Sequence, residues 1–156
     1  MKYRAVALCL VKSENQYLLV EKYDEVLDVT YYRPVGGTIE YGEDSKSTVI
    51  REVREEISAE ISEPILVSVI ENIYPYGTSI GHDINFIYEA GFIDESFYTR
   101  KQIIGTEGEE SFNAIWIDLA TINKDDKRKL VPEGLMTILT EENDSKLSEI
   151  KHYRTR

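Results

Sequence analysis

Residues 36–59 constrain the fold of this chain most, because they join a glycine pair to a strongly patterned helix. At about 100° per residue, a helix over residues 45–57 places its apolar side chains on one arc, formed by Val49, Ile50, Val53 and Ile57. Asp44 or Ser45 supplies an N-cap for this helix. The glycine pair permits a backbone path that other residues do not follow easily. The segment therefore predicts an amphipathic helix packed on a sheet and entered through a glycine turn.

Three glutamates border the apolar arc of this helix. Glu52 and Glu56 are four residues apart at its edge, and Glu55 lies just beyond them. Their mutual repulsion is unfavourable unless cations neutralise it, and clustered carboxylate oxygens are ligands for hard cations such as Mg²⁺ or Mn²⁺. The spacing thus predicts a metal site formed by Glu52, Glu55 and Glu56. The alternative for such a run alone is a solvated, charged helix face.

Arg51 and Gly37 are well placed to support this site. Arg51 lies four residues before Glu55, and Glu43 lies two turns earlier, so the guanidinium can brace carboxylates while it stays charged. We therefore place Arg51 among the candidate catalytic residues in an orienting role. Gly37 lets peptide groups approach a metal ion and a phosphate closely, which makes it a candidate part of the metal site.

The order of these residues resembles the Nudix box, in which Gly, five residues, Glu and seven residues precede Arg-Glu-apolar-x-Glu-Glu-x-Gly-apolar. The matching residues here are Gly37, Glu43, Arg51, Glu52, Val53, Glu55 and Glu56. Ser58 stands in place of the last glycine, and Ala59 is a weak apolar residue. The serine favours a helix end that does not need the left-handed backbone conformation typical of glycine.

The resemblance implies a Mg²⁺-dependent pyrophosphohydrolase, with Mn²⁺ as an alternative metal. Its substrate is expected to be a nucleotide-type small molecule: a nucleoside diphosphate linked to another moiety, or a nucleoside triphosphate. Several Nudix enzymes carry a further glutamate ahead of a strand like the one containing Trp116. Of Glu107, Glu109 and Glu110, we prefer Glu110 as a metal ligand or base, against the alternative of a solvated acidic loop.

Three residues outside the box are candidate substrate contacts. Arg33 can reach a phosphate, against the alternative of a surface ion pair. Tyr76 can offer a face to a base, and His82 can contact substrate, although packing and an edge hydrogen bond are the ordinary roles of such residues. The subfamily signals disagree. Pro75 resembles the mark of ADP-ribose hydrolases, and Tyr76 that of dinucleoside polyphosphate hydrolases.

Apolar runs on either side of the box predict strands at residues 3–11, 17–23, 30–35, 65–72, 82–93 and 114–118, and a closing helix at 132–139. Tyr74-Pro75-Tyr76-Gly77 predicts a hairpin connection, and residues 94–113 form a polar connecting segment. This order resembles the Nudix fold. The expected class is α/β (α+β), a Nudix-like α/β/α sandwich with a central mixed β-sheet.

At 156 residues, the chain is expected to form a single Nudix hydrolase domain over residues 1–156. A formal charge of −11 argues against partners such as nucleic acid or an anionic membrane. It also opposes a phosphorylated substrate, unless divalent cations and local basic residues receive it. The single cysteine excludes an internal disulfide and favours the reducing cytoplasm. Strand edges and hairpins are compatible with a homodimer.

Two other functions compete with hydrolysis. A Nudix-fold sensor would bind a nucleotide without cleaving it, but the intact carboxylates argue against that alternative. An isomerase on the same scaffold needs a catalytic cysteine, and Cys9 lies inside an apolar run far from the box.

Overall fold

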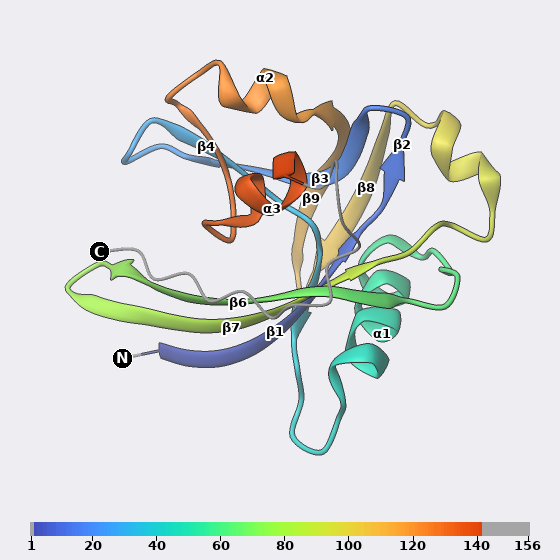
Figure 1. Cartoon of the computed structure of the whole chain (residues 1–156), viewed down its shortest axis with the longest axis horizontal. Helices are drawn as coiled ribbons and strands as arrows, with labels where there is room; N and C mark the ends of the chain where they lie inside the picture. Colours follow the sequence, from blue (N-terminus) through green and yellow to red (C-terminus); the bar gives the residue numbers. More distant parts are fainter. Residues whose placement is uncertain (1, 142–156) are drawn as a thin grey trace.

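The strands form two mixed sheets with helices on both sides (Figure 1), and the computed structural model describes residues 2–141. The first sheet contains β1 (Lys2–Leu10), β5 (Val35–Thr38), β6 (Ile65–Tyr76) and β7 (Ser79–Glu89). Its order is β5-β1-β7-β6, and β1 runs parallel to β7 while the other neighbours are antiparallel.

The second sheet has the order β10-β4-β3-β9-β8, with β2 paired to β3. Its strands are β2 (Lys12–Ser13), β3 (Gln16–Asp24), β4 (Val29–Arg33), β8 (Gln102–Glu107), β9 (Glu110–Asp118) and β10 (Arg128–Leu130). The helices are α1 (Ser45–Ile57), the 3-10 helix η1 (Glu95–Thr99), α2 (Leu119–Asn123) and α3 (Leu135–Glu141). The expected α+β class is confirmed, with the strands divided between two sheets.

β1 carries apolar side chains on both faces, which explains its continuous apolar run. On one face, Ala7 and Cys9 pack in the same core as the apolar arc of α1. On the other face, Val6, Leu8 and Leu10 share a core with Leu135, Ile138 and Leu139 of α3. Figure 1 shows α1 and α3 on opposite sides of this sheet. The sheet therefore separates the region of α1 from the region beneath α3.

α1 has the predicted bounds, and Asp44 is its N-cap, accepting a hydrogen bond from the Ser47 N–H at 2.9 Å. Its C-terminal end differs from the prediction. Ser58 adopts the left-handed conformation, with φ 55° and ψ 34°, and its N–H donates to the Arg54 carbonyl at 3.0 Å. The helix therefore keeps the geometry that favours glycine, and the serine bears its steric cost.

The segment 94–113 is more regular than its polar composition indicates, because it contains η1, β8 and the start of β9. β8 is an outer strand of the second sheet, and within it only Ile103 and Gly105 are buried. Such a strand has little apolar sequence to reveal it. α2 and β10 are likewise short elements that the sequence pattern did not predict.

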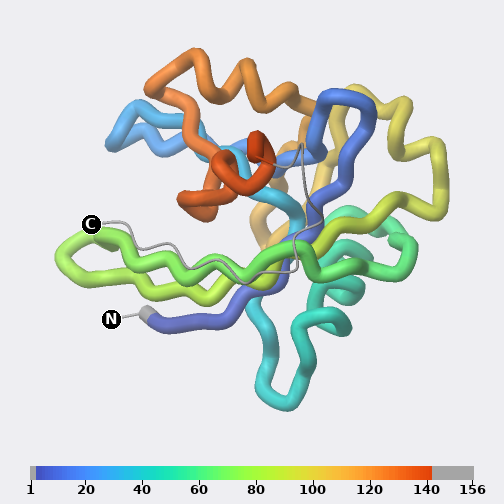
Figure 2. The backbone as a smooth tube through the Cα atoms, in the orientation of Figure 1, coloured from blue at the N-terminus to red at the C-terminus, as the bar shows by residue number. Residues whose placement is uncertain are grey.

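The β6–β7 hairpin is longer than predicted. β6 includes Tyr74-Pro75-Tyr76, which pair with residues of β7, and the turn itself is Gly77-Thr78. Figure 2 shows this hairpin as the long arm of the first sheet. Within the described part of the chain, helices are too short or too polar to cross a lipid bilayer.

Candidate active site

Glu52 and Glu56 of α1 lie against the backbone of Gly36-Gly37 at the edge strand β5. The Gly36 N–H donates to Glu56 Oε2 at 3.2 Å. A Cβ added at Gly37 would lie 2.6 Å from the Glu52 carboxylate, and one added at Gly36 would lie 2.1 Å from the Ala7 carbonyl oxygen. Larger residues are therefore excluded at both positions, and the two carboxylates reach main-chain groups of the glycine pair.

Glu56 is the most deeply buried of the glutamates in the box, with 5% of its surface exposed. Burial raises the pKa of its carboxyl group to about 7, and the negative charges of Glu52 and Glu107 act in the same direction. The Arg33 charge and the Gly36 N–H oppose this shift. Glu56 Oε1 is buried and has no hydrogen-bond partner among residues 2–141. A buried carboxylate oxygen without a partner is costly unless a ligand satisfies it.

Arg51 braces the carboxylates as expected. Its Nε and Nη2 each donate to a Glu43 oxygen at 2.9 Å, and its Nη1 donates to Glu52 at 2.8 Å and to Glu55 at 3.1 Å. These bonds lower the pKa of Glu43 to about 2 and raise the pKa of Arg51 above its ordinary value. The Glu55 side chain is 61% exposed, so Arg51 holds it at the outer side of the helix.

The sequence predicted that the three glutamates share one strip of the helix, and the structure differs from that prediction. Glu52 and Glu56 face the glycine pair, whereas Glu55 points outward to Arg51. In the structure of residues 2–141, no three Asp, Glu, His or Cys side chains form a ready-made metal cluster. The donors nevertheless fit a hard divalent cation, because Glu56 Oε1 lacks a partner beside the Glu52 carboxylate and the Gly37 backbone.

Glu107 and Glu110 lie at the end of the β8–β9 hairpin, and the Glu107 charge acts on Glu56. Both residues sit opposite each other across the β8–β9 turn, and hence on the same side of the hairpin. On that side of β8, a Cβ added at Gly105 would lie 2.8 Å from the Glu56 carbonyl oxygen, so the strand packs closely on α1. The Glu107 charge is among the causes that raise the pKa of Glu56. The preference for Glu110 stays a prediction, and Glu107 joins it as a second candidate on the same side of the hairpin.

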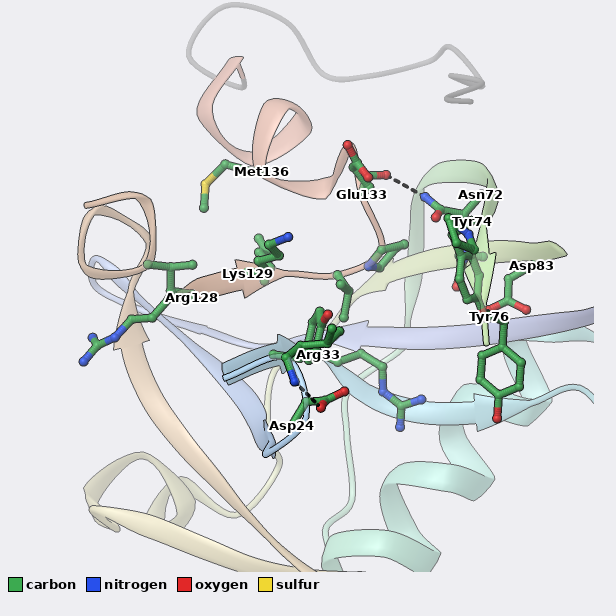
Figure 3. Close-up of a pocket in the computed structure, with 18 of the residues that line it drawn as sticks. Asp24, Arg33, Asn72, Tyr74, Tyr76, Asp83, Arg128, Lys129, Glu133 and Met136 are labelled. Atoms are coloured by element: carbon green, nitrogen blue, oxygen red, sulfur yellow. Dashed lines mark hydrogen bonds between the residues drawn. The ribbon is translucent and has the colours of Figure 1, made fainter. Parts of the chain in front are cut away.

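A cleft of about 900 Å³ adjoins this site on the side of the first sheet that faces α3 (Figure 3). Its lining includes Arg33 and Tyr76, two of the predicted substrate contacts. Arg33 also donates from Nη2 to the Gly36 carbonyl at 3.0 Å. It therefore connects the cleft with the glycine pair that holds Glu56.

His82 lies elsewhere. Its neighbour Asp83 lines the cleft, so the alternation of a strand directs His82 to the opposite face of the sheet. There its Nε2 is 2.9 Å from Glu71 Oε1, and its ring meets Tyr3 edge-on at 5.1 Å. β7 is an inner strand, so His82 is not the edge residue that the sequence indicated.

The polar floor of the cleft was not predicted from the sequence. Arg4, Asn72, Asp83 and Asn85 all line it, and the last three are buried. The sequence carries one sign of this floor. Asp83 and Asn85 are polar residues two positions apart in an apolar strand, where apolar residues are expected to face a core.

Comparisons with known proteins agree with this geometry. The family model of the NUDIX domain matches residues 1–134. The structure of a Nudix hydrolase from Nitrosomonas europaea superposes with a TM-score of 0.64 at 16% identity, covering 99% of this chain and 81% of that one. A MutT Nudix hydrolase from Burkholderia pseudomallei gives a TM-score of 0.61 at 16% identity, covering 89% of this chain and 98% of that one.

A MutT protein from Bacillus halodurans gives a TM-score of 0.61 at 18% identity, covering 97% of this chain and 89% of that one. These likenesses show the fold. A curated relative, the methanol dehydrogenase activator of Bacillus methanolicus, is 24% identical over 129 residues, which cover 83% of this chain and 63% of that relative. The family model extends over both sheets and the whole glutamate-rich helix, and the chain belongs to the Nudix family.

Proposed function

We propose that this chain hydrolyses a diphosphate bond in a nucleotide-type small molecule, with Mg²⁺ or Mn²⁺ as its cofactor. The observation that carries the proposal is the buried Glu56 carboxylate next to Glu52 and Gly37. Its Oε1 has no hydrogen-bond partner among the described residues. Burying an ionisable group in this way is unfavourable unless a cation compensates it.

Glu52, Glu56 and the Gly37 carbonyl are the oxygen donors for the cation, and Glu55 is an outer donor. When bound there, a divalent ion supplies charge for the diphosphate oxygens and lowers the pKa of a coordinated water. Arg51 keeps Glu52 in position through the 2.8 Å hydrogen bond and is itself anchored on Glu43. Its role is therefore positioning rather than contact with substrate.

Two further residues complete the proposed site. Glu107 lies close enough to Glu56 for their charges to interact, which makes it the candidate acceptor for the proton of the attacking water. Arg33 reaches from the cleft to Gly36, where it can bind a phosphate. A local cation matters in a chain of formal charge −11, because the overall field repels a phosphorylated substrate.

The test is a substrate panel with Mg²⁺ or Mn²⁺: nucleoside triphosphates, ADP-ribose, dinucleoside polyphosphates and nucleotide sugars. We expect one class to release nucleoside monophosphate or phosphate, and Glu56→Gln and Glu52→Gln each to lower turnover at least about 100-fold. Glu109→Gln, in the exposed β8–β9 turn, is the matched control and should keep activity. Binding without turnover across the panel would instead identify a nucleotide sensor.

A further inference from the structure

Three neighbouring strands place a polar row on the floor of the cleft. Arg4 of β1 pairs in register with Asp83 of β7, which pairs with Asn72 of β6. One step further in, Asn85 lies between Val6 and Ile70. Asn72, Asp83 and Asn85 are only 5%, 5% and 4% exposed. Polar groups at such depth need partners, because their desolvation is otherwise uncompensated.

Asp83 already has its partners. Arg4 donates to both of its oxygens at 3.0 Å, and the Tyr74 hydroxyl donates to Oδ2 at 3.0 Å. The Tyr74 ring in turn covers Gly81, where an added Cβ would lie 2.5 Å from the ring. Asp83 is therefore an internal anchor that fixes the Arg4 guanidinium at the cleft wall.

Among residues 2–141, each of the two asparagines makes a hydrogen bond through its amide nitrogen and none through its amide oxygen. Asn72 donates from Nδ2 to the Glu133 carbonyl at 3.0 Å, and Asn85 donates from Nδ2 to the Ile70 carbonyl at 3.3 Å. Figure 3 shows the Asn72 bond to the segment before α3. Within the described residues, neither Oδ1 accepts a hydrogen bond, and both residues line the cleft. A role in holding the fold accounts for one N–H of each amide, whereas the two oxygens are not fully enclosed and are open to a ligand in the cleft.

We propose that Asn72 and Asn85 select the organic moiety of the substrate, by accepting hydrogen bonds from its amino or hydroxyl groups. This inference rests on the proposed function, since Arg33 joins the cleft to the diphosphate site. A carboxamide oxygen accepts but does not donate. The cleft therefore favours a moiety that presents donors and disfavours one that presents carbonyl oxygens at the same place.

Two parts of a nucleotide supply such donors: the amino group of a base and the hydroxyl groups of a sugar. The base source predicts a preference for guanine over hypoxanthine and for cytosine over uracil. The sugar source predicts a preference for ribose over deoxyribose. An acceptor that a bound ligand covers without donating to it loses its water, which costs enough to give a loss of about tenfold in affinity for the analogue without the donor.

The test measures binding of nucleoside monophosphates to the wild-type chain in EDTA by calorimetric titration. The pairs are guanosine against inosine monophosphate, cytidine against uridine monophosphate, and each ribonucleotide against its deoxyribonucleotide. A loss of about tenfold on removing the amino group supports the base as the source, and the same loss on removing the hydroxyl supports the sugar. Equal affinities in all pairs, or no saturable binding, would overturn the inference.

Asn72→Leu and Asn85→Leu should each reduce the preference found in the wild type. Asn123→Leu is the matched control, because Asn123 lines the same cleft from α2 but is exposed, and it should leave the preference intact. Circular dichroism checks that each variant folds, and the wild-type ligand pairs decide the question if a variant does not. EDTA prevents metal-dependent turnover, so the binding test is independent of the hydrolysis test. A donor preference in binding without hydrolysis in the substrate panel contradicts only the proposed function. Hydrolysis in the panel without a donor preference in binding contradicts only this inference.

Discussion

Glu56 keeps a carboxyl group in surroundings that disfavour its charge. Burial and two acidic neighbours raise its pKa to about 7, while the Arg33 charge and one backbone N–H oppose them. Neither opposing group satisfies Oε1. The residue therefore combines a destabilised anion with an open coordination position, which is the combination expected of a metal ligand.

Arg51→Lys should lower activity although it preserves the charge. An ammonium group cannot make the separate, directed bonds that the guanidinium makes to Glu43, Glu52 and Glu55. We expect kcat to fall about tenfold or more, and steady-state kinetics on the substrate found by the panel would measure it. An unchanged kcat with a lower melting temperature would show that Arg51 only stabilises the fold.

Glu107→Gln and Glu110→Gln form a matched pair across one β-turn. We expect Glu107→Gln to reduce kcat by about 100-fold, because Glu107 is the proposed proton acceptor and its charge acts on Glu56, and Glu110→Gln to stay within about threefold of wild type. Both variants remove one exposed negative charge, so the comparison cancels the change in net charge. The opposite ranking would restore Glu110 as the catalytic glutamate.

At the scale of elements, α1 ends in a strained residue. Ser58 has a φ of 55°, a region in which a side chain clashes with the backbone and glycine does not. Its N–H still closes the last turn on Arg54. The helix end therefore retains the geometry of a glycine cap with a residue less suited to it.

Ser58→Gly should raise the free energy of unfolding by about 0.5–1 kcal/mol, because the relief of strain exceeds the added chain entropy of glycine. Ser58→Ala is the control: it retains a Cβ and should give no such gain. Urea unfolding of the three proteins measures both differences. Equal stabilisation by alanine would show that the hydroxyl, and not the backbone conformation, is unfavourable.

The sequence predicted α1 to the residue, because its period, cap and glycine pair all agree. It also indicated which glutamates border the apolar arc. It did not predict that Glu56 is buried while Glu55 is exposed, because that burial depends on β8, which packs on α1 and lies far from the box in the sequence. β8 was not predicted because an exposed outer strand has little apolar pattern. The cleft floor was not predicted because its residues come from three separate strands.

At the scale of the whole molecule, one sheet carries two different tasks on its two sides. The α1 side provides the carboxylates at its edge, and the α3 side provides the cleft with its polar floor. Arg33 and Gly36 connect the two at β4 and β5. Under the proposed function, this arrangement would allow the diphosphate group and the organic moiety of one substrate to be bound by separate groups of residues.

The central claim is that Glu52 and Glu56, on the glycine pair, hold the catalytic cation. The most direct measurement is the melting temperature as a function of Mg²⁺ or Mn²⁺, compared with NaCl at equal ionic strength. In the wild type, divalent ions should give an increase that EDTA reverses and that grows with the logarithm of ion concentration above the dissociation constant, worth about 2.7 kcal/mol at 100 times that constant. The increase should disappear in the Glu52→Gln/Glu56→Gln double variant and persist in Glu109→Gln. A shift that NaCl reproduces, or one that survives in the double variant, would contradict the account.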